Sequence, residues 1–231
     1  MNCIAIIPAR GGSKRIPRKN IKDFLGKPII AYSIEAALES NIFDEVMVST
    51  DDHEIAEIAK EYGASVPFLR SAENSTDQAE TAPVLLEVLE EYANRGKYYE
   101  SISCIYPCAP FVTADRLRQG MEKLLTEGAD CIFPVVKFSH PPQRGLIIKD
   151  GRVAMLHPEN NSVRTQDFEP LYHDAGQFYF VRSNALKEEK RVLCKHSLPF
   201  ILNDSEVQDI DSEEDWKVAE IKYWIINGFN K

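Results

Sequence analysis

The sequence predicts an α/β fold in which a mainly parallel sheet is covered by helices on both faces and carries a small protruding lobe. Short apolar, β-branched runs alternate with amphipathic helical patterns, which indicates repeated strand–helix units. The alternation stops after Val136, and a hairpin signal follows it. We therefore expect one domain over residues 1–231, with residues 138–172 as a hairpin-containing insertion.

The first half of the chain contains most of the strand–helix units. Residues 3–7 form a continuous apolar run, as expected of a strand buried on both faces. The helix expected over residues 52–62 follows Ser49, Thr50 and Asp51, which suit N-cap and first-turn positions. The expected strands are 3–7, 46–49, 65–69, 102–106 and 131–135, and the expected helices are 28–38, 52–62, 81–92 and 114–125.

The second half begins with the insertion and then returns to the sheet. Asp150-Gly151 separates two apolar runs, 146–149 and 152–156, and is a strong two-residue hairpin signal. After an irregular stretch, strand character returns at 177–181 and 198–202, and a closing helix is expected over 213–226.

Composition and charge exclude several classes of protein. Hydrophobic residues make up 44% of the chain and charged residues 27%, and no apolar run approaches the length of a bilayer span. A net charge of −9 argues against a nucleic-acid partner. The five cysteines form no Cys-x-x-Cys pair, which favours reduced core residues. We expect a cytoplasmic protein with neither a nucleic-acid nor a membrane partner.

A cationic, glycine-containing loop follows the first expected strand. Gly11 and Gly12 allow backbone N–H groups to face an anion, and their spacing fits neither the Walker loop nor the dinucleotide fingerprint. Six basic residues precede the first acidic one: Arg10, Lys14, Arg15, Arg18, Lys19 and Lys22. This pattern indicates a triphosphate site, with a solvated basic turn as the alternative.

Two carboxylates near the C-terminus form a candidate metal site. In a strand, Asp209 and Asp211 would project from one face, and such hard oxygen ligands suit Mg²⁺ when phosphate oxygens complete its shell. Alternatively, this segment caps the last helix, with Ser212 and Asp215 forming a capping box. Both interpretations are compatible.

Two polar stretches, 164–167 and 172–179, suit a polyhydroxylated acidic ligand, because they combine a cation, amides and carboxylates. His173 is a candidate base within them, although a structural role is the simpler interpretation.

Several stretches, in order along nearly the whole chain, resemble the CMP-sialic acid synthetase (acylneuraminate cytidylyltransferase) family. They are Ile7 to Lys14, Pro17 to Asn20, Gly26-Lys27-Pro28, Ser49-Thr50-Asp51 and Asp209-Ile210-Asp211. Through residues 105–111, 164–167 and 172–179 the chain is most similar to the pseudaminic acid cytidylyltransferases of that family. The resemblance implies a Rossmann-like α/β domain and a homodimer formed through the protruding lobe.

The resemblance also implies substrates and site residues. The substrates would be CTP and an acidic nine-carbon sugar, with Mg²⁺ as cofactor. The residues implied for the triphosphate are Arg10, Ser13 and Lys19; for the nucleoside, Asn20, Arg70, Ala79 and Thr81; and for Mg²⁺, Asp209 and Asp211. Lys14 is a further substrate-binding candidate, and the candidates for the sugar are Tyr106, Arg164, Gln166 and Asp174. Of these, Arg10, Lys19, Asp209 and Asp211 are the expected catalytic residues.

The expected reaction is attack of the sugar's anomeric hydroxyl on the α-phosphorus of CTP. Tyr106, Phe111, Asp174 and Gln177 lie where the chain departs from the sialic acid pattern, which favours pseudaminic acid. The alternatives are a CMP-N-acetylneuraminic or CMP-legionaminic acid synthetase and a non-catalytic nucleotide-binding module. Arg70 could instead pair with Glu73 at the surface, and Thr81 could cap a helix.

Overall fold

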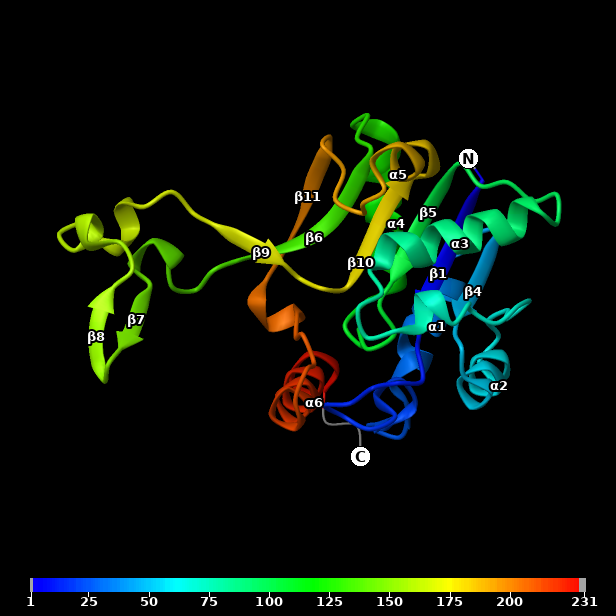
Figure 1. Cartoon of the computed structure of the whole chain (residues 1–231), viewed down its shortest axis with the longest axis horizontal. Helices are drawn as coiled ribbons and strands as arrows, with labels where there is room; N and C mark the ends of the chain where they lie inside the picture. Colours follow the sequence, from blue (N-terminus) through cyan, green and yellow to red (C-terminus); the bar gives the residue numbers. More distant parts are fainter. Residues whose placement is uncertain (1, 229–231) are drawn as a thin grey trace.

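A seven-stranded sheet forms the centre of the computed structural model, which describes residues 2–228. Its strands are β1 (Cys3–Pro8), β4 (Glu45–Ser49), β5 (Ser101–Ile105), β6 (Cys131–Lys137), β9 (Tyr172–Asp174), β10 (Phe178–Arg182) and β11 (Ser197–Leu202). The strand order is β11-β6-β10-β5-β1-β4, and β9 pairs with the end of β6. All run in one direction except β9 and β10, so the expected mainly parallel sheet is confirmed. These two return antiparallel along β6 because the chain comes straight back from the lobe (Figure 1).

Helices cover both faces of the sheet, as expected. They are α1 (Ile29–Ser40), α2 (His53–Glu61), α3 (Thr81–Ala93), α4 (Ala114–Thr126), α5 (Ser183–Glu189) and α6 (Glu213–Asn227). Side chains alternate along β1: Ala5 and Ile7 pack with α1, α2 and α4, whereas Ile4 and Ile6 pack with α3 and α5. Because β1 is buried on both faces, its sequence is continuously apolar. Within residues 2–228, no helix has the length and apolar character needed to cross a membrane.

One expected strand does not form. The segment 65–69 makes only a single bridge, between Ser65 and Met47, because Pro67 has no N–H with which to extend the ladder. Residues 207–211 also pair with no strand, so Asp209 and Asp211 lie in a loop segment that precedes α6. Helix α5, in contrast, was not expected from the sequence.

The expected hairpin is present within the insertion. Strands β7 (Leu146–Lys149) and β8 (Arg152–Met155) pair antiparallel, and Asp150 and Gly151 have φ angles of 52° and 73°. Positive φ at both positions is what a type I′ turn requires. Figure 1 shows this lobe projecting beyond β6 and β9, well away from the main sheet. Its apolar side chains are exposed, with Ile148 at 80%.

The last helix, α6, holds the segment that precedes it beside the loop after β1. Trp216 of α6 and Ile210 pack with Phe24 and Tyr32 in one apolar cluster. Ser212 caps the helix through a capping box with Asp215, as the sequence predicts. The start of α6 is thereby fixed, and residues 209–211 lie next to the N-terminal loop.

Candidate active site

A cleft of about 440 Å³ opens at the carboxyl ends of β1 and β5. This edge is where open α/β sheets bind their ligands. Ten of the residues expected at the site line the cleft: Arg10, Ser13, Lys14, Lys19, Asn20, Arg70, Ala79, Thr81, Tyr106 and Asp209. Arg10 and Asp209 are 199 positions apart in the sequence, yet the fold places both in the lining of this cleft.

The loop after β1 folds tightly against the end of β4. The Gly11 N–H donates to Asp51 Oδ1 at 2.9 Å. A Cβ on Gly11 would lie 2.7 Å from Asp52 Oδ2, which is closer than real Cβ atoms approach. Only glycine allows this approach, so the loop backbone is held at the mouth of the cleft.

Four of the loop's cations line the cleft, and carboxylates already bind them. Arg10 lies 2.8 Å from Asp77 Oδ1, and Lys14 binds the other oxygen of Asp77. Arg15 contacts Asp211 at 2.8 Å. Exposed ion pairs of this kind are weak, so a triphosphate could displace the carboxylates from these cations. Asp77 was not expected at the site; its position shortly before Ala79 and Thr81 was the only signal.

The remaining basic residues of the loop have structural partners. Arg18 binds Asp52 and Glu54, and Lys22 binds Glu213 and lies 4.6 Å from the Trp216 ring centroid. Hydrogen bonding from Arg18 lowers the pKa of Asp52 to about 2, so this carboxylate remains ionised. These two cations anchor the loop to α2 and α6.

Lys19 connects the loop to the segment before α6. Its Nζ donates to the backbone oxygen of Ile210 at 2.6 Å and lies 3.8 Å from Asp211 Oδ1. The ammonium group is therefore held where the loop after β1 meets the segment that carries Asp209 and Asp211.

Asn20 is locked in place from both ends of its amide. Its Nδ2 donates to the Arg10 backbone oxygen at 2.9 Å, and its Oδ1 accepts from the Cys108 thiol at 3.2 Å. Burial raises the pKa of Cys108 to about 12, so the thiol is a neutral donor. Cys108 was not expected among the site residues, and its only sequence signal was its position within the stretch 105–111.

Arg70 and Thr81 form the far wall of the cleft. Arg70 is 8% exposed and donates from Nε to Ser49 Oγ at 3.0 Å, so the alternative of a surface pair with Glu73 is wrong. Burial lowers its pKa. The N-cap of α3 is Glu80, not Thr81, and the Thr81 hydroxyl lies 3.3 Å from the hydroxyl of Tyr106. The side chains of Arg70 and Thr81 both line the cleft.

Asp209 and Asp211 lie close enough to interact. Burial raises the pKa of Asp209, and the charge of Asp211 adds to this effect. Within residues 2–228, no group of three or more acidic, histidine or cysteine side chains could hold a metal ion. Two carboxylates fit Mg²⁺ when phosphates and waters supply its other oxygens, as is usual at nucleotide sites.

The other expected residues lie outside the cleft lining. Arg164 and Gln166 are exposed on the lobe, where Arg164 pairs with Asp167. Asp174 is exposed at the end of β9, two residues before Gly176, which does line the cleft. His173 packs its ring 4.9 Å from that of Phe138 at the root of the lobe, in keeping with its structural interpretation.

A cationic, glycine-containing loop and neighbouring carboxylates at the carboxyl end of a parallel sheet indicate a nucleotidyl-transfer class of site. Residues 4–205 match the cytidylyltransferase family, and the chain belongs to it. The chain is 44% identical over 224 residues to a pseudaminic acid cytidylyltransferase from Campylobacter jejuni, covering 96% of this chain and 97% of that protein. It is also 34% identical to the CMP-N,N'-diacetyllegionaminic acid synthase of Legionella pneumophila, covering 95% of each.

The fold agrees with a solved structure of a more distant protein. The structure of a CMP:2-keto-3-deoxy-manno-octonic acid synthetase complexed with CTP superimposes with a TM-score of 0.71, at 15% identity, covering 98% of this chain and 99% of that one. This likeness confirms the expected α/β fold.

Proposed function

We propose that this chain is a pseudaminic acid cytidylyltransferase, which transfers CMP from CTP to the sugar and releases pyrophosphate. The 44% identity to the Campylobacter jejuni enzyme over 96% of the chain carries the proposal. The cleft supports it, because cations from the loop after β1 and the Asp209 carboxylate from the segment before α6 meet there. Such a site suits a reaction that depends on positioning and on charge stabilisation.

The residues divide by the part of CTP that each would bind. Arg10, Ser13, Lys14 and Lys19 hold the triphosphate, and Asn20, Arg70, Ala79 and Thr81 surround the nucleoside. The anomeric hydroxyl gives up its proton to Asp209, Asp211 or water as its oxygen forms a bond to the α-phosphorus. The bond from the α-phosphorus to the oxygen that bridges to the β-phosphorus breaks, and the loop cations neutralise the charge of the departing pyrophosphate. Asn20 keeps the loop backbone in place during this step through its bond to the Arg10 carbonyl.

Asp209 and Asp211 would hold Mg²⁺ beside the triphosphate. When bound, the ion supplies positive charge to the phosphate oxygens. Lys19 contacts the same segment, and its ammonium group limits the repulsion between the two carboxylates.

The lobe has two properties that favour a two-fold homodimer. Its hairpin exposes Leu146, Ile148 and Val153 at 65%, 80% and 66%, which is costly for a short hairpin that stands in water. It also carries Arg164 and Gln166, and the lobe as a whole projects away from the sheet (Figure 1). In a dimer, the hairpin would be covered and these polar residues could approach the sugar in the other subunit's cleft.

The sugar assignment is tested by competition in one reaction. The protein, CTP and Mg²⁺ are incubated with equal pseudaminic and N-acetylneuraminic acid, and the two CMP-sugars are quantified. We expect CMP-pseudaminic acid to predominate, because a site built for one pattern of polar groups rejects analogues that leave those groups unpaired. Equal or preferential activation of N-acetylneuraminic acid would contradict the sugar assignment but not the chemistry. A pyrophosphate-release screen that includes legionaminic acid tests the second candidate, and nucleotide binding without any release would indicate a binding module.

A further inference from the structure

Two tyrosines connect the nucleoside wall of the cleft to the root of the lobe. Tyr106 lines the cleft, and its hydroxyl lies 3.3 Å from Thr81 Oγ1. Tyr179, on β10, is 4% exposed and donates its hydroxyl hydrogen to Asp174 Oδ2 at 2.7 Å. The rings of Tyr106 and Tyr179 also contact each other. Hydrogen bonds and this ring contact therefore form a network that runs from Thr81 to Asp174.

The carboxylate of Asp174 is oriented by two donors. Its Oδ1 accepts from the Gly176 N–H at 2.8 Å, and its Oδ2 accepts from Tyr179. Gly176 lines the cleft, and a Cβ there would lie 3.9 Å from Asp209 Cγ, so this turn adjoins the expected metal site. A carboxylate can accept about four hydrogen bonds. Asp174 is exposed, so it retains acceptor capacity for the hydroxyl or amide groups of a ligand.

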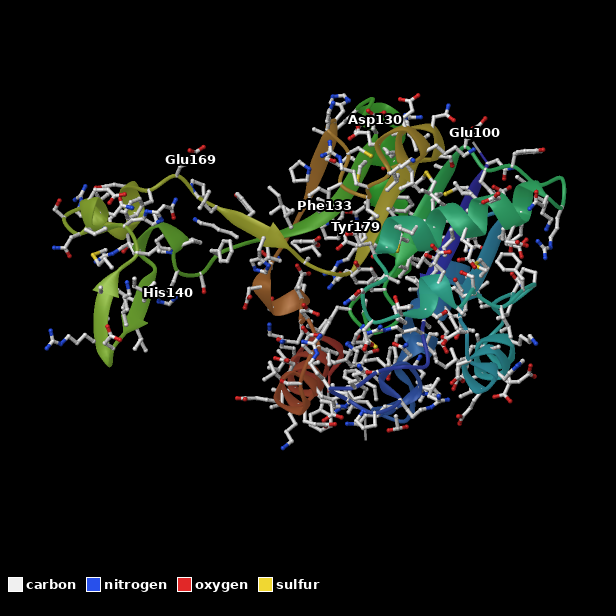
Figure 2. All side chains as sticks on the ribbon, viewed as in Figure 1. Glu100, Asp130, Phe133, His140, Glu169 and Tyr179 are labelled. Atoms are coloured by element: carbon white, nitrogen blue, oxygen red, sulfur yellow. The ribbon has the colours of Figure 1, made fainter. Side chains whose placement is uncertain are left out.

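Tyr179 is a rigid donor. Its ring stacks on Phe133 with centroids 6.1 Å apart and also contacts Tyr106 with centroids 5.4 Å apart. Figure 2 shows Tyr179 and Phe133 close together on the part of the sheet from which β9 leads to the lobe. Burial raises the pKa of Tyr179, with further contributions from Tyr106 and Asp174. The hydroxyl therefore stays protonated and continues to donate at neutral pH.

We infer that Tyr179 is a positioning residue for the sugar substrate: its hydroxyl fixes the Asp174 carboxylate and, through Tyr106, relates it to the nucleoside wall. The inference rests on the proposed function, because it assigns Asp174 to the sugar. Without the hydroxyl, only the Gly176 N–H would hold the exposed carboxylate, and the sugar would have to order its second oxygen on binding. The network also links the expected CTP and sugar sites, because Tyr106 contacts Thr81 and Tyr179 binds Asp174.

Tyr179→Phe removes the hydroxyl and keeps the ring. We expect KM for the sugar to rise about tenfold, kcat to change by less than about threefold, and the Kd for CTP, measured by calorimetry, to stay within about twofold. Tyr99→Phe is the matched control, because Tyr99 is also buried, at 9% exposure, in the same apolar cluster but has no place in the network. It should leave all three quantities unchanged.

A double-mutant cycle with Asp174→Asn separates positioning from general destabilisation. If Tyr179 acts through Asp174, the double variant is no worse than Asp174→Asn alone. An unchanged sugar KM in Tyr179→Phe, effects that multiply, or an equal loss of CTP affinity overturns the inference. The cycle uses whichever nonulosonic acid the wild type activates, so a different preferred sugar alters only the substrate assignment. A wild type that activates none overturns the proposed function and this inference together.

Discussion

Replacing Lys19 by alanine should strongly weaken the use of CTP. The ammonium lies 2.6 Å from the Ile210 oxygen and 3.8 Å from an Asp211 oxygen, and the side chain is 23% exposed. A phosphate charge about 4 Å from Nζ would gain roughly 4 kcal/mol at an effective dielectric constant of about 20. Solvent screening and the competing Asp211 charge reduce this to about 2–3 kcal/mol. We therefore expect kcat/KM for CTP to fall about 30- to 150-fold.

The assay is initial-rate pyrophosphate release at varied CTP, with calorimetry for binding and thermal unfolding to show that the fold persists. Lys22→Ala is the matched control, because Lys22 belongs to the same basic run but binds Glu213 outside the cleft. It should change kcat/KM by less than about twofold. If Lys19→Ala keeps normal CTP affinity and turnover, or if Lys22→Ala lowers kcat/KM as much as Lys19→Ala does, the loop acts only as a diffuse basic surface. Lys19 then has no specific contact with the triphosphate.

Four further predictions follow from the site and the lobe. Asp209→Asn and Asp211→Asn should each lower turnover by on the order of a hundredfold. EDTA should abolish activity until Mg²⁺ is restored, and full turnover in EDTA would refute the metal site. Gly11→Ala should weaken CTP binding, because its Cβ would meet Asp52 Oδ2 at 2.7 Å, whereas Gly12→Ala, with nothing within 4 Å, should bind normally. Asp52→Asn, which can still cap α2, should lower the free energy of unfolding by about 1 kcal/mol at pH 7. Because the pKa of Asp52 is depressed to about 2, this stabilisation is present above pH ~4 and is lost as the pH falls towards 2. The urea unfolding curves of the variant and the wild type should therefore converge near pH 2. Light scattering at micromolar concentration should give the mass of a dimer, and a monomer would count against the role of the lobe.

The sequence by itself determined the features that depend on local patterns. The apolar run of β1 predicts a strand buried on both faces, and Asp150-Gly151 predicts the turn of the hairpin, because backbone preference decides both. The capping box at Ser212 could likewise be read directly, since its partners are three residues apart. The resemblance supplied the residues expected at the site, ten of which the fold brings to one cleft.

Only the tertiary structure decided how distant side chains divide their roles. Nothing in the run of six basic residues shows that Arg18 and Lys22 bind Asp52 and Glu213, because those partners come from other elements. The strand expected over 65–69 shrinks to one bridge because pairing needs an N–H that Pro67 lacks. The contact between Tyr106 and Tyr179 depends on the antiparallel pairing of β5 with β10, so only the folded topology brings these two rings together.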